Sequence, residues 1–315
     1  MRSIYKIIGG LVGLVLLGYF VHFLFSAFEP ASLAKLAAPR PIAAIAAAAA
    51  LYGLIIPLSA RAWRCLLPES SGQWPLRTLC GIMGVTQLAK YVPGNVMQHA
   101  SRTALTLAHG MCLRNFMTSV TAETVLALLA ALMVGLVCLA GFDSAVSELP
   151  RVGAYAPFLV LALSIFVLAM PALIRMVGVI ARKTRWESVI AYWLQSVPGQ
   201  RAQLRAFAIY CGNYLLIGGG CVLIVHALGL AHQLGYAQLT AAFALSWLAG
   251  FLAPGMPAGF GVREGVMALM LGGSAEQGDV LSAILAMRLA TICGDVAWFI
   301  LGGWLLANGK SGIKR

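Results

Sequence analysis

The chain has 315 residues, of which 61% are hydrophobic and only 10% are charged, and its formal net charge is +12. Soluble domains carry roughly a quarter charged residues, so this composition excludes a water-soluble fold and indicates a polytopic membrane protein. Because the basic residues lie between apolar segments, the positive charge follows the positive-inside rule and does not indicate nucleic-acid binding.

Six apolar segments are long enough to cross about 30 Å of hydrocarbon, which takes roughly 20 residues. They are residues 7–28, 41–60, 116–140, 153–176, 206–230 and 281–307. The first follows the basic stretch MRSIYK, but its apolar core is longer than that of a signal peptide, so we expect an uncleaved anchor. Two further apolar regions, 78–110 and 238–272, are each interrupted by a Pro-Gly pair.

The charges sort to one side of the membrane if both interrupted regions are re-entrant hairpins. Most lysines and arginines then lie on cytoplasmic loops, and only Lys35, Arg40 and Arg151 lie outside. This asymmetry predicts that both termini are cytoplasmic, in a multi-pass protein of the plasma (inner) membrane.

The two Pro-Gly pairs belong to a candidate internal repeat. A shift of 161 residues places Pro93-Gly94 over Pro254-Gly255 and Arg102 over Arg263, nine residues after each proline. Each half, 1–150 and 151–315, then contains two crossings, a hairpin and a third crossing, and this odd number inverts the second half. Inverted repeats with broken helices are the architecture of many secondary transporters.

We therefore expect one domain, 1–315, with an all-α polytopic membrane fold. It would contain about six transmembrane helices and two Pro-Gly re-entrant helical hairpins in an inverted repeat.

The helix breaks predict an anion site. Irregular backbone survives inside a membrane only where protein or a wet cavity surrounds it. Free N–H groups at the start of the helix after each break favour anions, and an arginine adds a planar donor fork suited to phosphate. After the first break, Asn95, Gln98 or His99, and Arg102 share one helix face, and Lys90 and Tyr91 precede it.

In the second interrupted region, Gly259 and Gly261 allow close approach of the backbone. Arg263 and Glu264 are adjacent and point about 100° apart on a helix. We expect one of them to bind a ligand and the other to attach the hairpin to a neighbouring helix.

Three more charged residues lie inside predicted spans: Glu123, Arg288 and Asp295. Each costs about 2.5–3.5 kcal/mol at mid-span unless it is paired or hydrated. Glu123 and Asp295 are equally consistent with function and with structural ion pairs such as Arg263–Glu123 or Arg288–Asp295, whereas Arg288 fits a functional role better. The full set of candidate substrate-binding residues is Lys90, Tyr91, Pro93, Gly94, Asn95, Gln98, Arg102, Glu123, Pro254, Gly255, Gly259, Gly261, Arg263, Glu264, Arg288 and Asp295.

No catalytic constellation stands out. The seven cysteines contain no CxxC pair and the five histidines form no HExxH motif, so we expect no disulfide framework, metal or cofactor.

The stretches KYVPGNVMQHASRTAL and APGMPAGFGVREG, together with Glu123, resemble the lysylphosphatidylglycerol synthase transmembrane region family. The resemblance covers nearly the whole chain. It implies a plasma-membrane protein and, for the characterised branch, movement of an aminoacylated phospholipid between leaflets. The aminoacyltransferase domain of that branch is missing from this sequence, so the resemblance implies a stand-alone member, whose cargo is a polyprenyl-phosphate sugar or another anionic lipid.

The leading hypothesis is a flippase-like protein that translocates an anionic or phosphate-bearing lipid, either a phospholipid or a lipid-linked glycan precursor. The alternatives are an intramembrane accessory subunit, or a transferase of lipid or glycolipid biosynthesis with Glu123 or Glu264 as base. The partners expected are a lipid with an anionic headgroup and, as alternatives, lipid or glycan biosynthetic enzymes or a second copy of the chain.

Overall fold

The computed structural model describes residues 36–68, 71–92, 96–140, 150–181, 187–253, 257–272 and 275–308. Every regular element in these ranges is a helix, so the predicted all-α class is confirmed. The elements are α3 (Pro39–Gly53), α4 (Ile55–Leu66), α5 (Leu76–Val85), the 3₁₀ helix η2 (Gln87–Tyr91), α6 (Val96–Ala108), α7 (Leu113–Ala140), α8 (Pro150–Ala181), α9 (Glu187–Leu194), α10 (Gln200–Ala227), α11 (Tyr236–Leu252), the 3₁₀ helix η3 (Pro257–Gly259), α12 (Val262–Leu271) and α13 (Gln277–Ala307).

Within the described ranges, four helical segments are long and apolar enough to cross a membrane: Pro39–Leu66, Leu113–Ala140, Gln200–Ala227 and Gln277–Ala307. They match four of the predicted crossings. The predicted crossing 153–176 falls within α8, which has 32 residues. The predicted crossing 7–28 lies outside the described residues. The chain is thus a membrane protein, and the total of six crossings stays a prediction.

The first described segment bends between α3 and α4, at Leu54. Pro57 has no N–H to donate to the carbonyl of Gly53 four residues earlier, so the helical hydrogen bond at this level is missing. The indole Nε1–H of Trp298 on α13 donates to this carbonyl instead. The bend therefore fixes α13 against the junction of α3 and α4.

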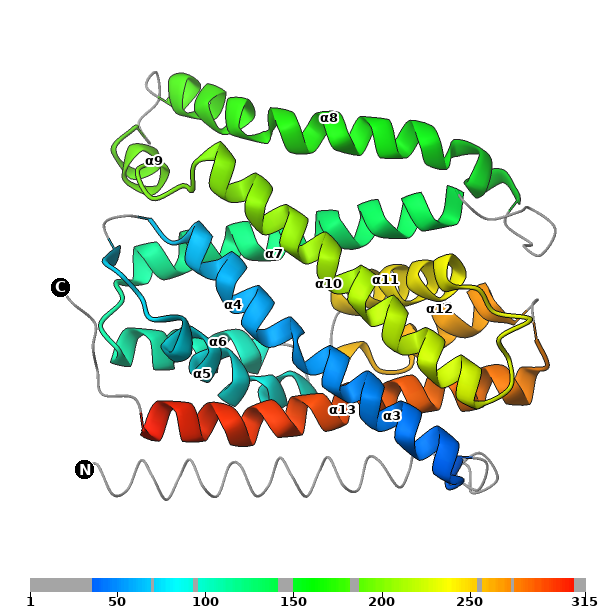
Figure 1. Cartoon of the computed structure of the whole chain (residues 1–315). Helices are drawn as coiled ribbons and strands as arrows, with labels where there is room; N and C mark the ends of the chain where they lie inside the picture. Colours follow the sequence, from blue (N-terminus) through cyan, green and yellow to red (C-terminus); the bar gives the residue numbers. More distant parts are fainter. Residues whose placement is uncertain are drawn as a thin grey trace.

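The two interrupted regions are broken as predicted. The first runs through α5, η2 and α6, and the second through α11, η3 and α12. In Figure 1, α5 and α6 lie on the left and α11 and α12 on the right. The two breaks meet in the middle, where Tyr91 of η2 and Ala258 of η3 pack with Ile292 of α13. Re-entry from opposite sides and the inverted repeat stay predictions.

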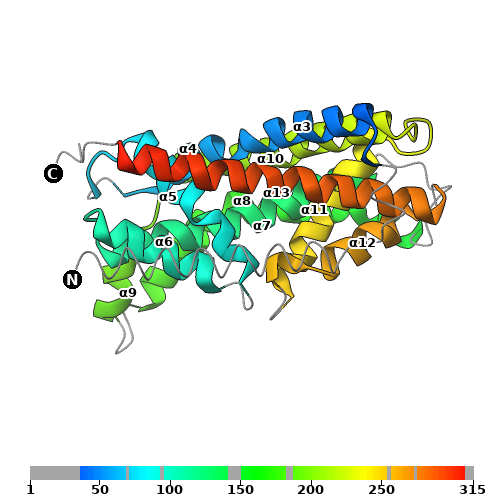
Figure 2. The same ribbon diagram turned by 90° about the horizontal axis from the view of Figure 1, so that it is seen from below.

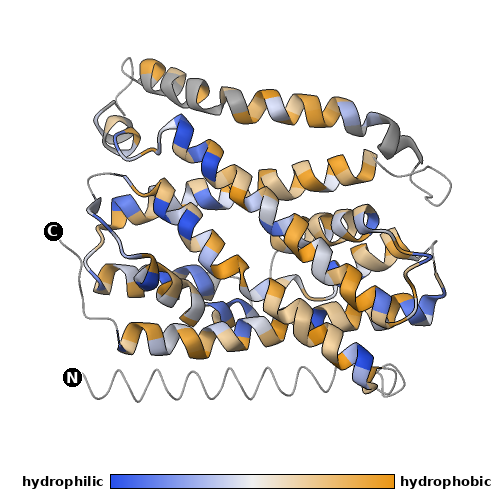
Figure 3. Ribbon diagram, viewed as in Figure 1, coloured by the Kyte–Doolittle hydropathy of each residue, from blue (hydrophilic) through white to orange (hydrophobic). Residues whose placement is uncertain are grey.

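Helix α13 runs along the length of the molecule and packs on α3 and α5 (Figures 1 and 2). Helices α7 and α10 pack on each other, and α8 lies outermost against α7 (Figure 1). The coloured part of α8 is largely hydrophobic (Figure 3), and its apolar side chains are exposed, Phe158 to 71%. An exposed apolar helix face of this kind suits contact with lipid.

Close helix packing at glycine gives a stability prediction. A Cβ atom at Gly218 of α10 would overlap Oγ1 of Thr240 on α11. We therefore expect Gly218→Ala to push these helices apart and to lower the free energy of unfolding by about 1–3 kcal/mol. Thermal unfolding in detergent measures the change.

The matched control is the next residue. A Cβ at Gly219 would meet no atom within 4 Å, so Gly219→Ala should leave the melting temperature unchanged or raise it slightly. Equal melting temperatures for the two variants would contradict the proposed close packing.

Candidate functional site

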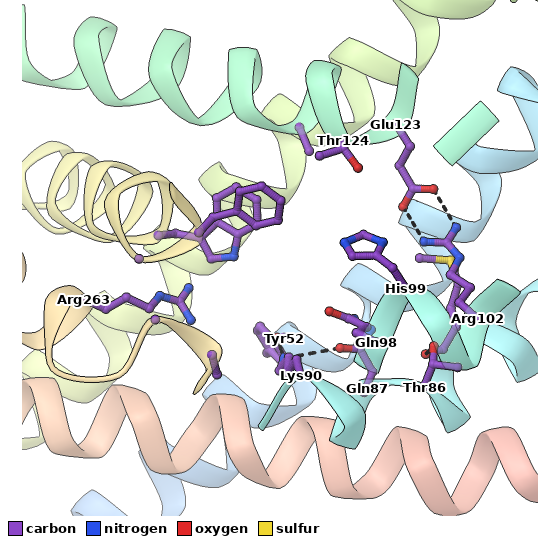
Figure 4. Close-up of a pocket in the computed structure, with 17 residues that line it drawn as sticks. Tyr52, Thr86, Gln87, Lys90, Gln98, His99, Arg102, Glu123, Thr124 and Arg263 are labelled. Atoms are coloured by element: carbon purple, nitrogen blue, oxygen red, sulfur yellow. Dashed lines mark hydrogen bonds and ion pairs between the residues drawn. The ribbon is translucent and has the colours of Figure 1, made fainter. Parts of the chain in front are cut away.

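A cavity of about 220 Å³ lies between the two broken segments. The first segment contributes Gln87, Lys90, Gln98, His99 and Arg102, and the second contributes Ala258, Gly259 and Arg263. Other elements contribute further wall residues, among them Tyr52, Glu123, Thr124, Trp247, Gly250 and Phe251. Figure 4 shows the charged and polar side chains of this wall gathered between the helices.

Arg263 points into the cavity from the start of α12, opposite Gln98 and His99 (Figure 4). Two glycines place it there. Gly259 has φ +69° and lies against Gly250 of α11, where an added Cβ would be 3.1 Å from Gly259 Cα and would overlap Cγ of Arg263. The stem of Arg263 therefore passes directly over the backbone of α11.

Within the described residues, no carboxylate forms an ion pair with Arg263. Its guanidinium lies 5.5 Å from the ring centroid of Phe243, at a distance typical of a cation–π contact. Arg263 is thus a cation in the cavity without a counter-charge from the described residues.

Arg102 on the opposite wall is paired. Its Nη1 and Nη2 donate to the two carboxylate oxygens of Glu123 on α7, over 3.0 and 2.6 Å (Figure 4). The indole of Trp63 covers the guanidinium, with Cζ 3.8 Å from the ring centroid, and Trp63 itself donates to Ser119 over 3.0 Å. This bidentate pair fixes α6 on α7.

Lys90 and Tyr91 of η2 bind Asp295 of α13. The Lys90 ammonium lies 2.7 Å from Oδ2 of Asp295, and the Tyr91 hydroxyl donates to the same oxygen over 2.6 Å. Tyr52 of α3 donates to Oδ1 over 3.3 Å. The Asp295 side chain is only 1% exposed, and these three donors compensate its burial. The cluster attaches the first break to both α13 and α3.

Glu264 attaches the second break to α13. It forms an ion pair with Arg288, and its other oxygen accepts the backbone N–H of Gly261 over 2.7 Å. The neighbours Arg263 and Glu264 thus take different directions, one toward the cavity and one toward a neighbouring helix. This is the division that their spacing predicts.

The predicted ion pairs Arg263–Glu123 and Arg288–Asp295 are wrong, because each of the four residues has another position or partner. Glu123 binds Arg102 and not Arg263, while Arg288 and Asp295 bind Glu264 and Lys90 and not each other. Residues seven apart share a helix face but lie about 10 Å apart along the axis. At these two levels α13 meets two different segments, and each supplies its own partner.

Among the described lysines and arginines that line the cavity, one has no carboxylate partner in the described part of the chain. Lys90 and Arg102 line the cavity and are neutralised by Asp295 and Glu123, whereas Arg263 is not neutralised. Arg288 binds Glu264, and it does not line this cavity. Of the three arginines among the predicted substrate-binding residues, Arg102 and Arg288 are therefore paired, and only Arg263 has no carboxylate partner among the described residues.

Other predicted site residues are distributed as follows. Gln98, Gly259 and Arg263 line the cavity, whereas Gly261, with φ +78°, is the residue directly before α12. The remaining predicted residues, which are Pro93, Gly94, Asn95, Pro254 and Gly255, lie outside the described residues.

The wall residues that sequence reasoning missed include Tyr52, Gln87, Trp247 and Gly250. Gly250 lies four residues before Pro254. A small residue on the last turn before a proline could have indicated that Gly250 belongs to the cavity wall. Tyr52 and Trp247 give no comparable signal, because aromatic residues are common in apolar spans.

The buried cluster at Asp295 gives the second prediction. Asp295→Asn removes the counter-charge of Lys90, and breaking a buried pair from one side costs about 3–5 kcal/mol of stability. We expect a lower melting temperature in detergent and partial recovery in the double variant Lys90→Met/Asp295→Asn. A double variant less stable than Asp295→Asn would contradict this assignment.

Comparison with known proteins agrees with this arrangement of a membrane domain. A family model described as the lysylphosphatidylglycerol synthase TM region matches residues 7–298. No curated protein gives a match.

Proposed function

The chain belongs to the lysylphosphatidylglycerol synthase TM region family, and from this premise we propose that it is flippase-like and translocates a lipid with an anionic or phosphate-bearing headgroup across the plasma membrane. The family itself is one of membrane domains related to lipid modification or flippase function. The observation that carries the proposal is Arg263, a cation in a polar cavity that has no carboxylate partner in the part of the chain that the structure describes.

A guanidinium held among apolar helices loses hydration, and an anionic group compensates this loss more fully than the contact with the Phe243 ring does. Arginine suits phosphate because its planar fork donates two parallel hydrogen bonds to two phosphate oxygens. Gln98 and His99 lie across the cavity and offer further polar contacts to a headgroup.

The cavity size suits a headgroup and not a whole lipid. Its volume is about 220 Å³, whereas pockets for drug-sized ligands measure about 300–1,000 Å³. The acyl chains would stay in the bilayer while the headgroup passes between the two broken segments. This division avoids moving the chains through a polar region.

The transferase alternative is less consistent with the geometry. Its candidate bases, Glu123 and Glu264, each bind an arginine, so neither carboxylate is free to accept a proton from a substrate. A purely structural role for all the charges accounts for the three ion pairs but not for Arg263.

Arg263→Ala tests the proposal. In proteoliposomes, fluorescent phosphatidylglycerol is added and its movement is followed by dithionite quenching. We expect the variant to move the lipid roughly tenfold more slowly than the wild type, because the loss of a desolvated charge contact costs about 2 kcal/mol or more. The melting temperature should change little, because no ion pair is lost.

Arg61→Ala is the control, because Arg61 lies on the exposed side of α4. Its transport rate should equal that of the wild type. An undiminished rate in Arg263→Ala would end the proposed role of this residue.

Gly250→Ala tests the placement of the arginine without changing any charge. The added methyl group overlaps the Arg263 stem and should displace the guanidinium from the cavity, so we expect a reduced transport rate in the same assay. Gly265→Ala on α12, where a Cβ meets no atom within 4 Å, should retain the wild-type rate. Equal rates in both variants would show that the glycine contact does not position Arg263.

A further inference from the structure

Tyr210 of α10 carries a buried hydroxyl without a hydrogen-bond partner. The residue is only 4% exposed, and its oxygen is among the few buried side-chain atoms of the described residues that find no donor or acceptor. Most buried hydroxyls in native proteins are satisfied, and an exception calls for an explanation in the function of the site.

The hydroxyl lies close to the level of Glu123. Helices α7 and α10 pack on each other and both run from left to right in Figure 1. One turn after Tyr210, the hydroxyl of Tyr214 donates to the carbonyl of Ala127 over 3.3 Å, and Ala127 is one turn after Glu123. Because Tyr210 and Glu123 each lie one turn before these two residues, the same register places Tyr210 at the level of Glu123.

The Arg102–Glu123 pair blocks a second anion site. Both oxygens of Glu123 bind the guanidinium, and Trp63 covers its face. The Nε–H of Arg102 is buried and also without a partner. A phosphate reaches Arg102 only if Glu123 moves away, and a displaced carboxylate needs a new donor.

We propose that Glu123 has two positions: on Arg102 when the cavity is empty, and on the Tyr210 hydroxyl when a singly charged phosphate headgroup in the cavity binds Arg102. Tyr210 is thus a positioning residue that receives the displaced carboxylate. The inference rests on the proposed function, because it requires an anionic headgroup in the cavity.

The charges balance in the occupied state. Lys90 stays neutralised by Asp295, while Arg102 and Arg263 face one phosphate charge and the charge of Glu123. Because Glu123 and the headgroup compete for Arg102, binding stays weak enough for release. The carboxylate returns to Arg102 as the lipid leaves.

The test measures affinity and stability in matched variants. The protein is placed in nanodiscs, and a fluorescent short-chain phosphatidylglycerol is titrated by anisotropy, with short-chain phosphatidylcholine as the uncharged comparison. We expect Tyr210→Phe to weaken phosphatidylglycerol binding roughly tenfold, because a hydrogen bond to a charged group is lost only in the occupied state. The melting temperature of the empty protein should stay the same or rise, because the lost hydroxyl has no partner there.

Tyr214→Phe is the matched control on the same helix. It removes a hydrogen bond that already exists, so it should lower the melting temperature and leave the affinity unchanged. Tyr210→Phe should thus change the affinity without lowering the melting temperature, and Tyr214→Phe the reverse. This difference distinguishes a hydroxyl that acts when the headgroup is bound from one that only stabilises helix packing.

Glu123→Gln completes the cycle. It removes the competing charge, so binding should become tighter, and Tyr210→Phe should then change the affinity less than about twofold. An unchanged affinity in Tyr210→Phe, or a full tenfold loss that persists with Glu123→Gln, would overturn the inference.

The two proposals fail differently in this experiment. If the wild type and Arg263→Ala bind the probe equally, or neither binds it, the anion site itself is wrong. If binding depends on Arg263 but not on Tyr210, only the two-position role of Glu123 is wrong.

Discussion

Charged side chains and broken backbone inside an apolar bundle must find partners within the protein, because lipid supplies none. In this protein each interrupted helix carries charges to its break, and each break is then fixed by an ion pair to a continuous helix. Lys90 and Arg102 of the first segment bind Asp295 and Glu123, and Glu264 of the second binds Arg288. The irregular segments are held in place by these pairs.

Helix α13 is the common support for both segments. It offers Asp295 to the first break, Arg288 to the second, and Trp298 to the bend after α3. Because all three contacts come from one continuous helix, the relative position of the two breaks is set along its axis. The cavity between them is therefore built by contacts within the fold, as a preorganised site requires.

Much of this could be predicted from the sequence. The prolines locate both breaks, and the adjacent Arg263 and Glu264 require different directions, as the structure has them. The partners of the charges could not be predicted, because spacing along α13 does not tell which segment packs at which level. The orphan hydroxyl of Tyr210 likewise depends on the register of α7 and α10. The repeat, its inversion and the side of each terminus stay predictions.

The bend at Leu54 separates two parts of the cavity surroundings. Tyr52, on one side, belongs to the Asp295 cluster, and Trp63, on the other, covers Arg102. The helical hydrogen bond that is missing at Pro57 is replaced there by the Trp298 indole, which holds the angle of the junction from α13. That angle sets the separation of the two charged clusters, so the width of the cavity is coupled to the geometry of a single bent segment.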